Sequence, residues 1–249
     1  MRRWGTLAAT ALTSAVALLG TASPTTAATT ASEDAAGPVI IARYTFDTVE
    51  ASGTIGDLSG RGHTLTPFTT RGGKVKLAIR DTGRAAAFPA KCTGRKCPHA
   101  VLQAPNTPEL NPGANPIRYG ATVKLGKGQT GSGENILQKG YSAAGGQYKL
   151  QVDGRAGRPS CVMSDNVVRG IHVAQSDVSI ADGGWHKLEC RRAGATLTLL
   201  VDDAVHATSA IPATLAITNA VPLSIGGKGD GNDNDQFHGS LDDVWIGLG

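Results

Sequence analysis

The stretch Phe237-His-Gly-Ser-Leu-Asp-Asp-Val-Trp-Ile246, near the end of the chain, alternates between apolar and polar residues as a β-strand does. Tyr44-Thr-Phe-Asp47, near the start, is a second short strand-like segment. One acidic residue, Asp47 or Asp242, interrupts the apolar pattern of each segment. Because burying an unpartnered carboxylate costs several kcal/mol, we expect each aspartate to have a partner. Strict alternation would also place Asp242 on the same face as Val244.

Short β-rich runs fill the chain between these two segments, and glycine, proline, asparagine or aspartate stands in nearly every gap. No window of about ten residues has the apolar spacing of an amphipathic helix; the nearest, Ala204–Ala213, contains Pro212 and is expected to be extended. This pattern predicts an all-β, antiparallel sandwich or barrel. The runs are Val39–Phe46, Lys74–Ile79, Ala85–Phe88, Ala100–Gln103, Arg118–Leu125, Asn135–Gln138, Tyr148–Val152, Cys161–Met163, Gly170–Ala174, Trp185–Cys190, Thr196–Val201, Pro222–Ile225 and Phe237–Ile246.

Residues 1–28 are typical of a signal peptide, because Arg2 and Arg3 precede the apolar stretch Trp4–Gly20 and small residues follow it. A twin-arginine signal is an alternative that two arginines alone do not establish. The apolar stretch is short for a membrane span, and no later stretch reaches about 20 apolar residues. We therefore expect a secreted, extracellular protein with no membrane span.

Residues 29–37 are small and polar and predict a flexible leader, and residues 38–249 are expected to form one domain. Without the two arginines of the signal segment, the count of Lys+Arg falls from 24 to 22 against 20 acidic residues, so the net charge falls from +4 to +2. The net charge therefore says little about binding partners. The basic cluster Lys91, Arg95 and Lys96 has no interleaved aromatic residue, and we expect no nucleic-acid binding.

Four cysteines, Cys92, Cys97, Cys161 and Cys190, remain after the signal segment, and export would place them in an oxidising compartment. Three pairings are possible. We favour Cys92 with Cys97, which closes a small loop, and Cys161 with Cys190, which both lie in strand-like runs. A zinc site is not expected, because the pair at 92 and 97 has no second closely spaced pair to complete it.

The order of several segments resembles the laminin G-like, concanavalin A-like lectin/glucanase family, in its secreted actinobacterial form. The resemblance covers residues from about 40 to 249 and implies an antiparallel jelly-roll β-sandwich that places Cys161 and Cys190 on neighbouring strands. The segments that carry it are Tyr44–Asp47, Asp57–His63, Gly83–Phe88, Asn135–Gly140, Tyr148–Val152, Trp185–His186, Val201–Asp203, Ile225–Gly227 and the final strand.

Members of this family often hold one calcium ion where the first and last strands meet, and the resemblance implies Asp47 and Asp242 as its ligands here. The alternative is that Asp47 caps a turn and Asp242 accepts backbone hydrogen bonds at the strand edge. The loop Asp230–Asp235 has the composition of a calcium loop, but it lacks the glycine at the sixth position and has Leu241 in place of the final glutamate. We expect a solvated hairpin loop there, with a second calcium site or a ligand-facing rim as alternatives.

Catalysis is not expected. Glucanases of this fold carry Glu-x-Asp-x-x-Glu on one strand, and this motif is absent. A Gly-x-Ser-x-Gly elbow is absent as well. The glutamates that follow the signal segment are Glu33, Glu50, Glu109, Glu134 and Glu189.

Histidines and turn aspartates are also expected to be structural. The resemblance implies that Trp185 packs and that His186 lies on its strand, while Asp202 and Asp203 are expected in a hairpin turn. The remaining histidines lack metal-ligand spacing; they are His63, His99, His172, His206 and His238.

The resemblance favours a non-catalytic module that binds an extracellular ligand, with carbohydrate first. The aromatic content is low, and Trp185 and Trp245 are the tryptophans of the domain. The sequence therefore gives no obvious set of aromatic rings on which a sugar could stack. Two alternatives stay open. One is a protein-binding adhesion or accessory module, and the other is a glycan-active enzyme that uses carboxylates such as Asp202 and Asp203.

Overall fold

The structure is a computed structural model that describes residues 37–50, 52–143, 145–165, 170–229, 231 and 233–249. The signal peptide expected over residues 1–28 and nearly all of the leader expected over 29–37 lie outside these residues. No helix of the described part is long and apolar enough to cross a membrane.

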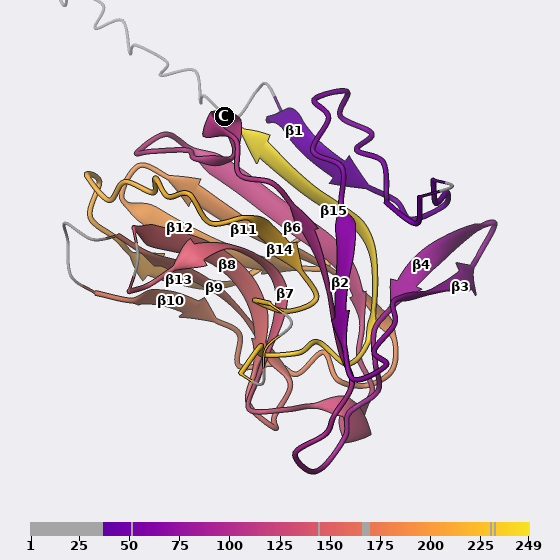
Figure 1. Ribbon diagram of the computed structural model, residues 1–249. Coiled ribbons are helices and arrows are strands. Elements are labelled where there is room, and N and C mark those ends of the chain that lie inside the picture. Colours follow the sequence, from indigo (N-terminus) through magenta and orange to yellow (C-terminus); the bar gives the residue numbers. More distant parts are fainter. Residues whose placement is uncertain (1–36, 51, 144, 166–169, 230, 232) are drawn as a thin grey trace, which may run out of the picture. The chain divides into compact units, whose positions relative to one another are not determined.

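Two antiparallel sheets pack face to face (Figure 1). The first sheet has the order β13-β12-β11-β6-β15-β4-β3, with β1 also paired to β15. Its strands are β1 (Val39–Tyr44), β3 (Lys76–Arg80), β4 (Gly83–Ala87), β6 (Ile117–Lys124), β11 (Trp185–Ala193), β12 (Thr196–Val201), β13 (Ala204–Ala210) and β15 (Ser240–Leu248).

The second sheet has the order β10-β9-β8-β7-β14-β5-β2. Its strands are β2 (Thr66–Thr70), β5 (His99–Ala104), β7 (Gly133–Tyr141), β8 (Gly146–Asp153), β9 (Arg158–Ser164), β10 (His172–Gln175) and β14 (Leu223–Ile225). Two short 3-10 turns, η2 (Pro108–Leu110) and η3 (Lys127–Gln129), are the helical elements among the described residues. The predicted fold class, an all-β antiparallel sandwich, is confirmed.

The core lies between the sheets, where the inward-facing residues of each strand meet. Tyr119 of β6 and Tyr148 of β8 contact each other across it, with ring centroids 5.1 Å apart. The disulfide Cys161–Cys190 joins β9 of the second sheet to β11 of the first. Cys92 and Cys97 form the second disulfide, so both pairings are those favoured from the sequence.

A β-bulge in β15 corrects one expectation. Between Asp242 and Trp245, β15 has one residue more than β6 opposite it, and Asp243 has a φ of 43°. The extra residue reverses the alternation, so that Leu241 and Val244 are both buried in the core. The prediction that Asp242 shares a face with Val244 is therefore wrong.

Candidate functional site

Polar side chains cover the outer face of the second sheet, which we call the amide face. The strand register aligns one residue from each of six neighbouring strands in a row across this face. From β5 to β10, the row consists of Gln103, Ser224, Gln138, Lys149, Val162 and Val173.

Simple alternation along β8 explains why these groups face outward. Tyr148 and Leu150 are buried in the core, so Gln147, Lys149 and Gln151 lie on the opposite face. This polar stripe, with a long hydrogen-bonding side chain at every second position, was present in the sequence and was not recognised as a site. Its spacing was the signal that could have revealed it.

Hydrogen bonds between side chains orient several of the amides. Gln103 Nε2 donates to Ser224 Oγ at 2.9 Å, and Gln151 Nε2 donates to Ser160 Oγ at 3.2 Å. Gln138 accepts from Asn135 Nδ2 and donates to the carbonyl oxygen of Gly140. The amide face is therefore an ordered array of donors and acceptors.

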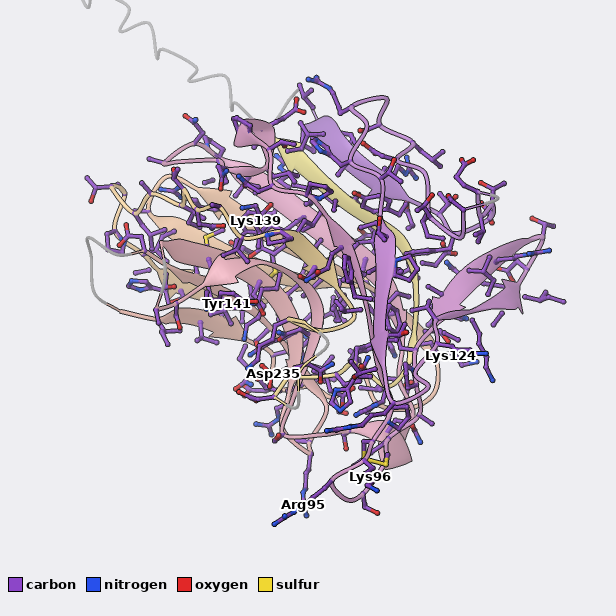
Figure 2. The ribbon with its side chains drawn as sticks, viewed as in Figure 1. Arg95, Lys96, Lys124, Lys139, Tyr141 and Asp235 are labelled. Carbon is purple, nitrogen blue, oxygen red and sulfur yellow. A yellow bond between two sulfur atoms is a disulfide. The ribbon has the colours of Figure 1, made fainter. Side chains whose placement is uncertain are left out.

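A shallow hollow of about 320 Å³ lies on the amide face. Tyr141 lies at its rim, where its hydroxyl donates to the carbonyl oxygen of Lys228 at 3.0 Å. Figure 2 shows Tyr141 and Asp235, which both line the hollow. The apolar part of the lining is open to solvent, since Ile171 is 61% exposed and Val173 is 42% exposed. The hollow thus combines amides with accessible apolar surface.

Two lysines in the hollow differ in their electrostatic surroundings. Burial acts to lower the pKa of Lys228, but hydrogen bonds to Asp233 and Asp235, both at 3.1 Å, raise it above its usual value. Burial lowers the pKa of Lys149, and the nearby charges of Asp235 and Asp153 only partly oppose that effect. The Lys149 ammonium is thus less well compensated.

β1 pairs with β15, with Tyr44 opposite Val244, so Asp47 follows β1 at the end of the pair where Asp242 lies. Burial raises the pKa of Asp242, and the charge of Asp47 contributes to the rise. The Arg80 guanidinium forms an ion pair with Asp242 and lies over the ring of Trp185, 4.4 Å from its centroid. Arginine therefore already supplies a cation to Asp242.

Local backbone geometry positions Asp47 tightly. Its Oδ1 accepts a hydrogen bond from the Arg84 amide at 2.9 Å, which lowers the pKa of Asp47. Phe46 has a φ of 59°, an uncommon conformation for a bulky residue, and a Cβ on Gly83 would lie 2.2 Å from Asp47 Oδ1.

The described residues contain no cluster of three or more His, Cys, Asp or Glu side chains that could hold a metal. Calcium at these two carboxylates would need backbone oxygens as further ligands and stays a prediction.

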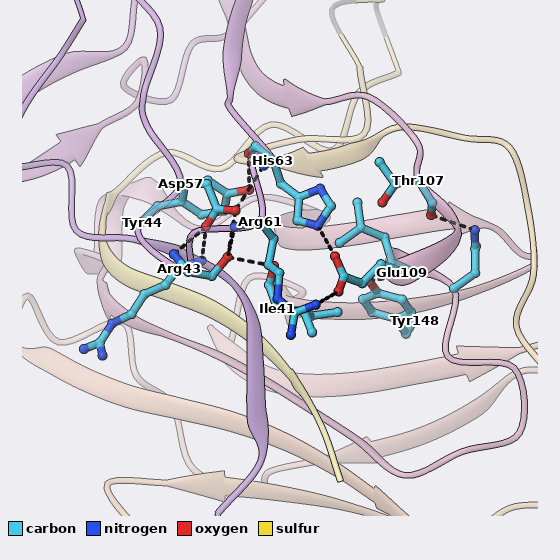
Figure 3. Close-up of polar contacts among 12 residues, drawn as sticks. Ile41, Arg43, Tyr44, Asp57, Arg61, His63, Thr107, Glu109 and Tyr148 are labelled. Atoms are coloured by element: carbon cyan, nitrogen blue, oxygen red, sulfur yellow. Dashed lines mark hydrogen bonds and ion pairs between the residues drawn. The ribbon is translucent and has the colours of Figure 1, made fainter.

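The segment Asp57–His63 forms a structural loop (Figure 3). The Asp57 carboxylate accepts backbone hydrogen bonds from Arg43 at 3.0 Å, Ser59 at 2.9 Å and His63 at 3.0 Å. The His63 Nε2 lies 3.1 Å from Glu109 Oε2. These contacts attach the loop to β1 and η2. A structural role therefore explains the polar residues of this segment.

The Asp202 and Asp203 pair forms the turn between β12 and β13. Both have left-handed backbone angles, with φ of 50° and 66°, as a tight hairpin turn requires. Asp202 also lies 2.8 Å from Nδ1 of His186 and accepts the Lys187 amide hydrogen bond at 2.8 Å. Hydrogen bonding to Asp202 raises the pKa of His186 against the opposing effect of burial.

The loop closed by Cys92 and Cys97 carries Arg95 and Lys96, which Figure 2 shows at its tip. The amide face is formed by other elements. Part of the loop Asp230–Asp235 lies outside the described residues, but Asp233 and Asp235 within it pair with Lys228.

Comparison with solved structures confirms the fold. The binding domain of Paraclostridial Mosquitocidal Protein 1 matches 84% of this chain and 48% of its own, with a TM-score of 0.61 and 14% identity. A botulinum neurotoxin type C structure, reported with cell entry dependent upon interaction with two ganglioside molecules, matches 84% of this chain and 48% of its own. Its TM-score is 0.59 and its identity 9%. Thus the chain spans about half the length of these toxin chains.

Domain 4 of AbnA, a GH43 extracellular arabinanase from Geobacillus stearothermophilus solved in complex with arabinotriose, matches 84% of this chain and 92% of its own. Its TM-score is 0.60 and its identity 16%, so the likeness concerns the fold. No curated protein sequence matches this chain. The family model described as the concanavalin A-like lectin/glucanases superfamily matches residues 107–247, more than half of the sequence. The chain therefore belongs to the concanavalin A-like lectin/glucanases superfamily.

Proposed function

We propose that the protein is a non-catalytic module that binds an extracellular carbohydrate in the hollow of the amide face. The observation that carries this proposal is the row of side chains across the amide face: it is polar on β5, β14, β7 and β8, and its members Gln138 and Lys149 line the hollow together with Gln147 and Gln151. Each glutamine amide both donates and accepts, as each sugar hydroxyl does.

Apolar groups beside the amides can pack against the apolar C–H faces of a sugar ring. The exposed side chains of Ile171 and Val173 and the ring of Tyr141 can contact the C–H faces of a pyranose or furanose. Mixed apolar and hydrogen-bonding linings are typical of small-ligand sites, where a few polar groups fix the orientation.

Structures of similar fold support this reading by analogy. One is the arabinanase domain bound to arabinotriose, and another is the neurotoxin whose title names gangliosides. Because one fold hosts many functions, the weight of the proposal rests on the amide face itself.

A binding role fits the hollow better than glycoside hydrolysis does. Retaining and inverting glycosidases need two carboxyl groups that flank the scissile bond. Among the described residues that line the hollow, Asp235 is the one carboxylate, and it is paired with Lys228. We further propose that the module acts outside the cell, where two disulfides are stable.

The proposal is tested with a glycan array followed by calorimetry on the glycans that bind. We expect Gln147→Ala and Gln151→Ala to weaken binding at least about tenfold, since each removes an amide that lines the hollow and can hydrogen-bond to the ligand. Asn115→Ala, which removes an exposed amide away from the hollow, serves as the matched control. Hydrolysis of a labelled polysaccharide would instead favour an enzyme, and binding only to a protein would favour an adhesion module.

A further inference from the structure

We propose that the carbohydrate bound in the hollow carries an oxyanion, a carboxylate or a sulfate, which pairs with the ammonium group of Lys149. This inference rests on the proposed function and specifies its ligand class. It starts from the position of Lys149, which stands in the middle of the row with Gln138 opposite it on β7 and Val162 opposite it on β9.

The other ionic groups of the hollow already have partners. Lys228 is paired with Asp233 and Asp235 at 3.1 Å each. One ammonium and two carboxylates give the Lys228 side of the hollow a net formal charge of −1. An anionic ligand would therefore find little uncompensated positive charge there.

Asp153, the second carboxylate whose charge reaches Lys149, is also engaged. It accepts hydrogen bonds from Gln151 Nε2 at 2.5 Å, Ser160 Oγ at 2.5 Å and Gln175 Nε2 at 3.2 Å. Three donors fix this carboxylate at the edge of the amide face.

Lys149 itself forms no ion pair with any residue in the described part of the chain, although it lines the hollow. Burial lowers its pKa, and the charge of Lys228 acts in the same direction. An oxyanion beside Lys149 would restore the interactions that its ammonium lost on leaving water. The neighbouring Gln147 makes no side-chain hydrogen bond within the described residues and can donate to the same group.

Three lysine variants test the inference by calorimetry. Lys149→Met removes the charge and keeps the length, Lys149→Arg keeps the charge, and Lys124→Met removes an exposed lysine from the first sheet (Figure 2). The probes are polygalacturonate for the carboxylate, dextran sulfate for the sulfate, and linear arabinan and dextran as neutral glycans. Titrations at about 50 and 500 mM salt report the ionic contribution.

We expect Lys149→Met to weaken binding of an anionic probe at least about tenfold, Lys149→Arg to weaken it less because the charge is kept, and Lys124→Met to stay within about twofold of the unchanged protein. High salt should reduce the affinity of the unchanged protein and have little effect on Lys149→Met. The probe that binds identifies the oxyanion as carboxylate or sulfate. If Lys149→Met binds like the unchanged protein, or if only neutral glycans bind, this inference is wrong while carbohydrate binding stands; if no glycan binds, both proposals fail.

Discussion

The ammonium nitrogen of Lys139 lies 2.6 Å from the side-chain oxygen of Asn219, on the inward side of β7. It also donates to Asn111 Oδ1 at 3.1 Å and to the Asn219 carbonyl oxygen at 3.3 Å. All three acceptors are neutral, and the residue is fully buried. Burial lowers the pKa of Lys139 to about 8. The lysine joins two loops to the sheet, but its charge is unfavourable in the folded state.

The free energy of unfolding should therefore rise with pH above about 8. In this range the unfolded chain keeps its proton on Lys139 up to about pH 10.4, whereas the folded chain releases it. The expected slope is about 1.4 kcal/mol per pH unit, measured by urea unfolding from pH 7.5 to 9.5. Lys139→Met should abolish this slope. Equal slopes in both proteins would show that Lys139 titrates normally.

Glu134 should produce the opposite pH dependence at lower pH. It is buried, and burial raises its pKa to about 7 although the amides of Gly131 and His238 donate to it. Between about pH 4.5 and 7 the folded chain holds a proton that the unfolded chain has lost, so stability falls as pH rises. Glu134→Gln should remove this fall, as measured by urea unfolding at pH 5, 6 and 7.

The comparison between Glu134→Gln and the unchanged protein isolates Glu134, even though His238 contributes to the pH dependence of stability in the other direction. Burial lowers the pKa of His238, so this group makes stability rise with pH. It is present in both proteins. A pH profile that Glu134→Gln leaves unchanged would contradict the prediction.

The Cys161–Cys190 disulfide should contribute more to stability than Cys92–Cys97. Its sequence separation is 29 against 5, and it joins the two sheets. Closing the longer loop removes more conformational entropy from the unfolded chain, which stabilises the folded chain by about 3.6 kcal/mol in the chain-entropy model. Replacing Cys161 and Cys190 by alanine should lower the free energy of unfolding by about that amount. The Cys92/Cys97 double alanine variant is the control, and an equal or larger loss in it would overturn the ranking.

Most strands could be predicted because their residues alternate and turn-forming residues separate them. β2 was not, since Thr66–Thr70 contains Pro67 and is an edge strand exposed along most of its length. The bulge at Asp243 could not be predicted either. One extra residue in a strand is recognised only from the register with its partner strand, which the apolar–polar alternation does not give.

The candidate site was harder to predict than the fold. Gln103, Gln138 and Ser224 lie far apart in sequence and become neighbours only through the register of β5, β14 and β7. Register is a property of strand pairs, which a single sequence does not specify. The pairing of the first and last strands, by contrast, could be expected from the resemblance, whereas a shared site at Asp47 and Asp242 stays a prediction.

Calcium should raise the melting temperature if it binds Asp47 and Asp242. An ion that binds only the folded chain stabilises it by about 2.7 kcal/mol at a hundredfold excess over its dissociation constant, or about 5–10 °C for a domain of this size. The structure adds a specific expectation, because Arg80 now pairs with Asp242 and would compete with the ion. Arg80→Met should therefore bind calcium more tightly, whereas Asp47→Asn and Asp242→Asn should lose the response.

Scanning calorimetry in millimolar calcium and in EDTA measures these shifts, with elemental analysis of the purified protein as a second readout. Asp177→Asn, which removes an exposed carboxylate, is the matched control and should respond like the unchanged protein. If EDTA leaves the melting temperature unchanged in both the unchanged protein and Arg80→Met, and no calcium is found, Asp47 serves to cap the turn at Arg84 and Asp242 serves to hold Arg80.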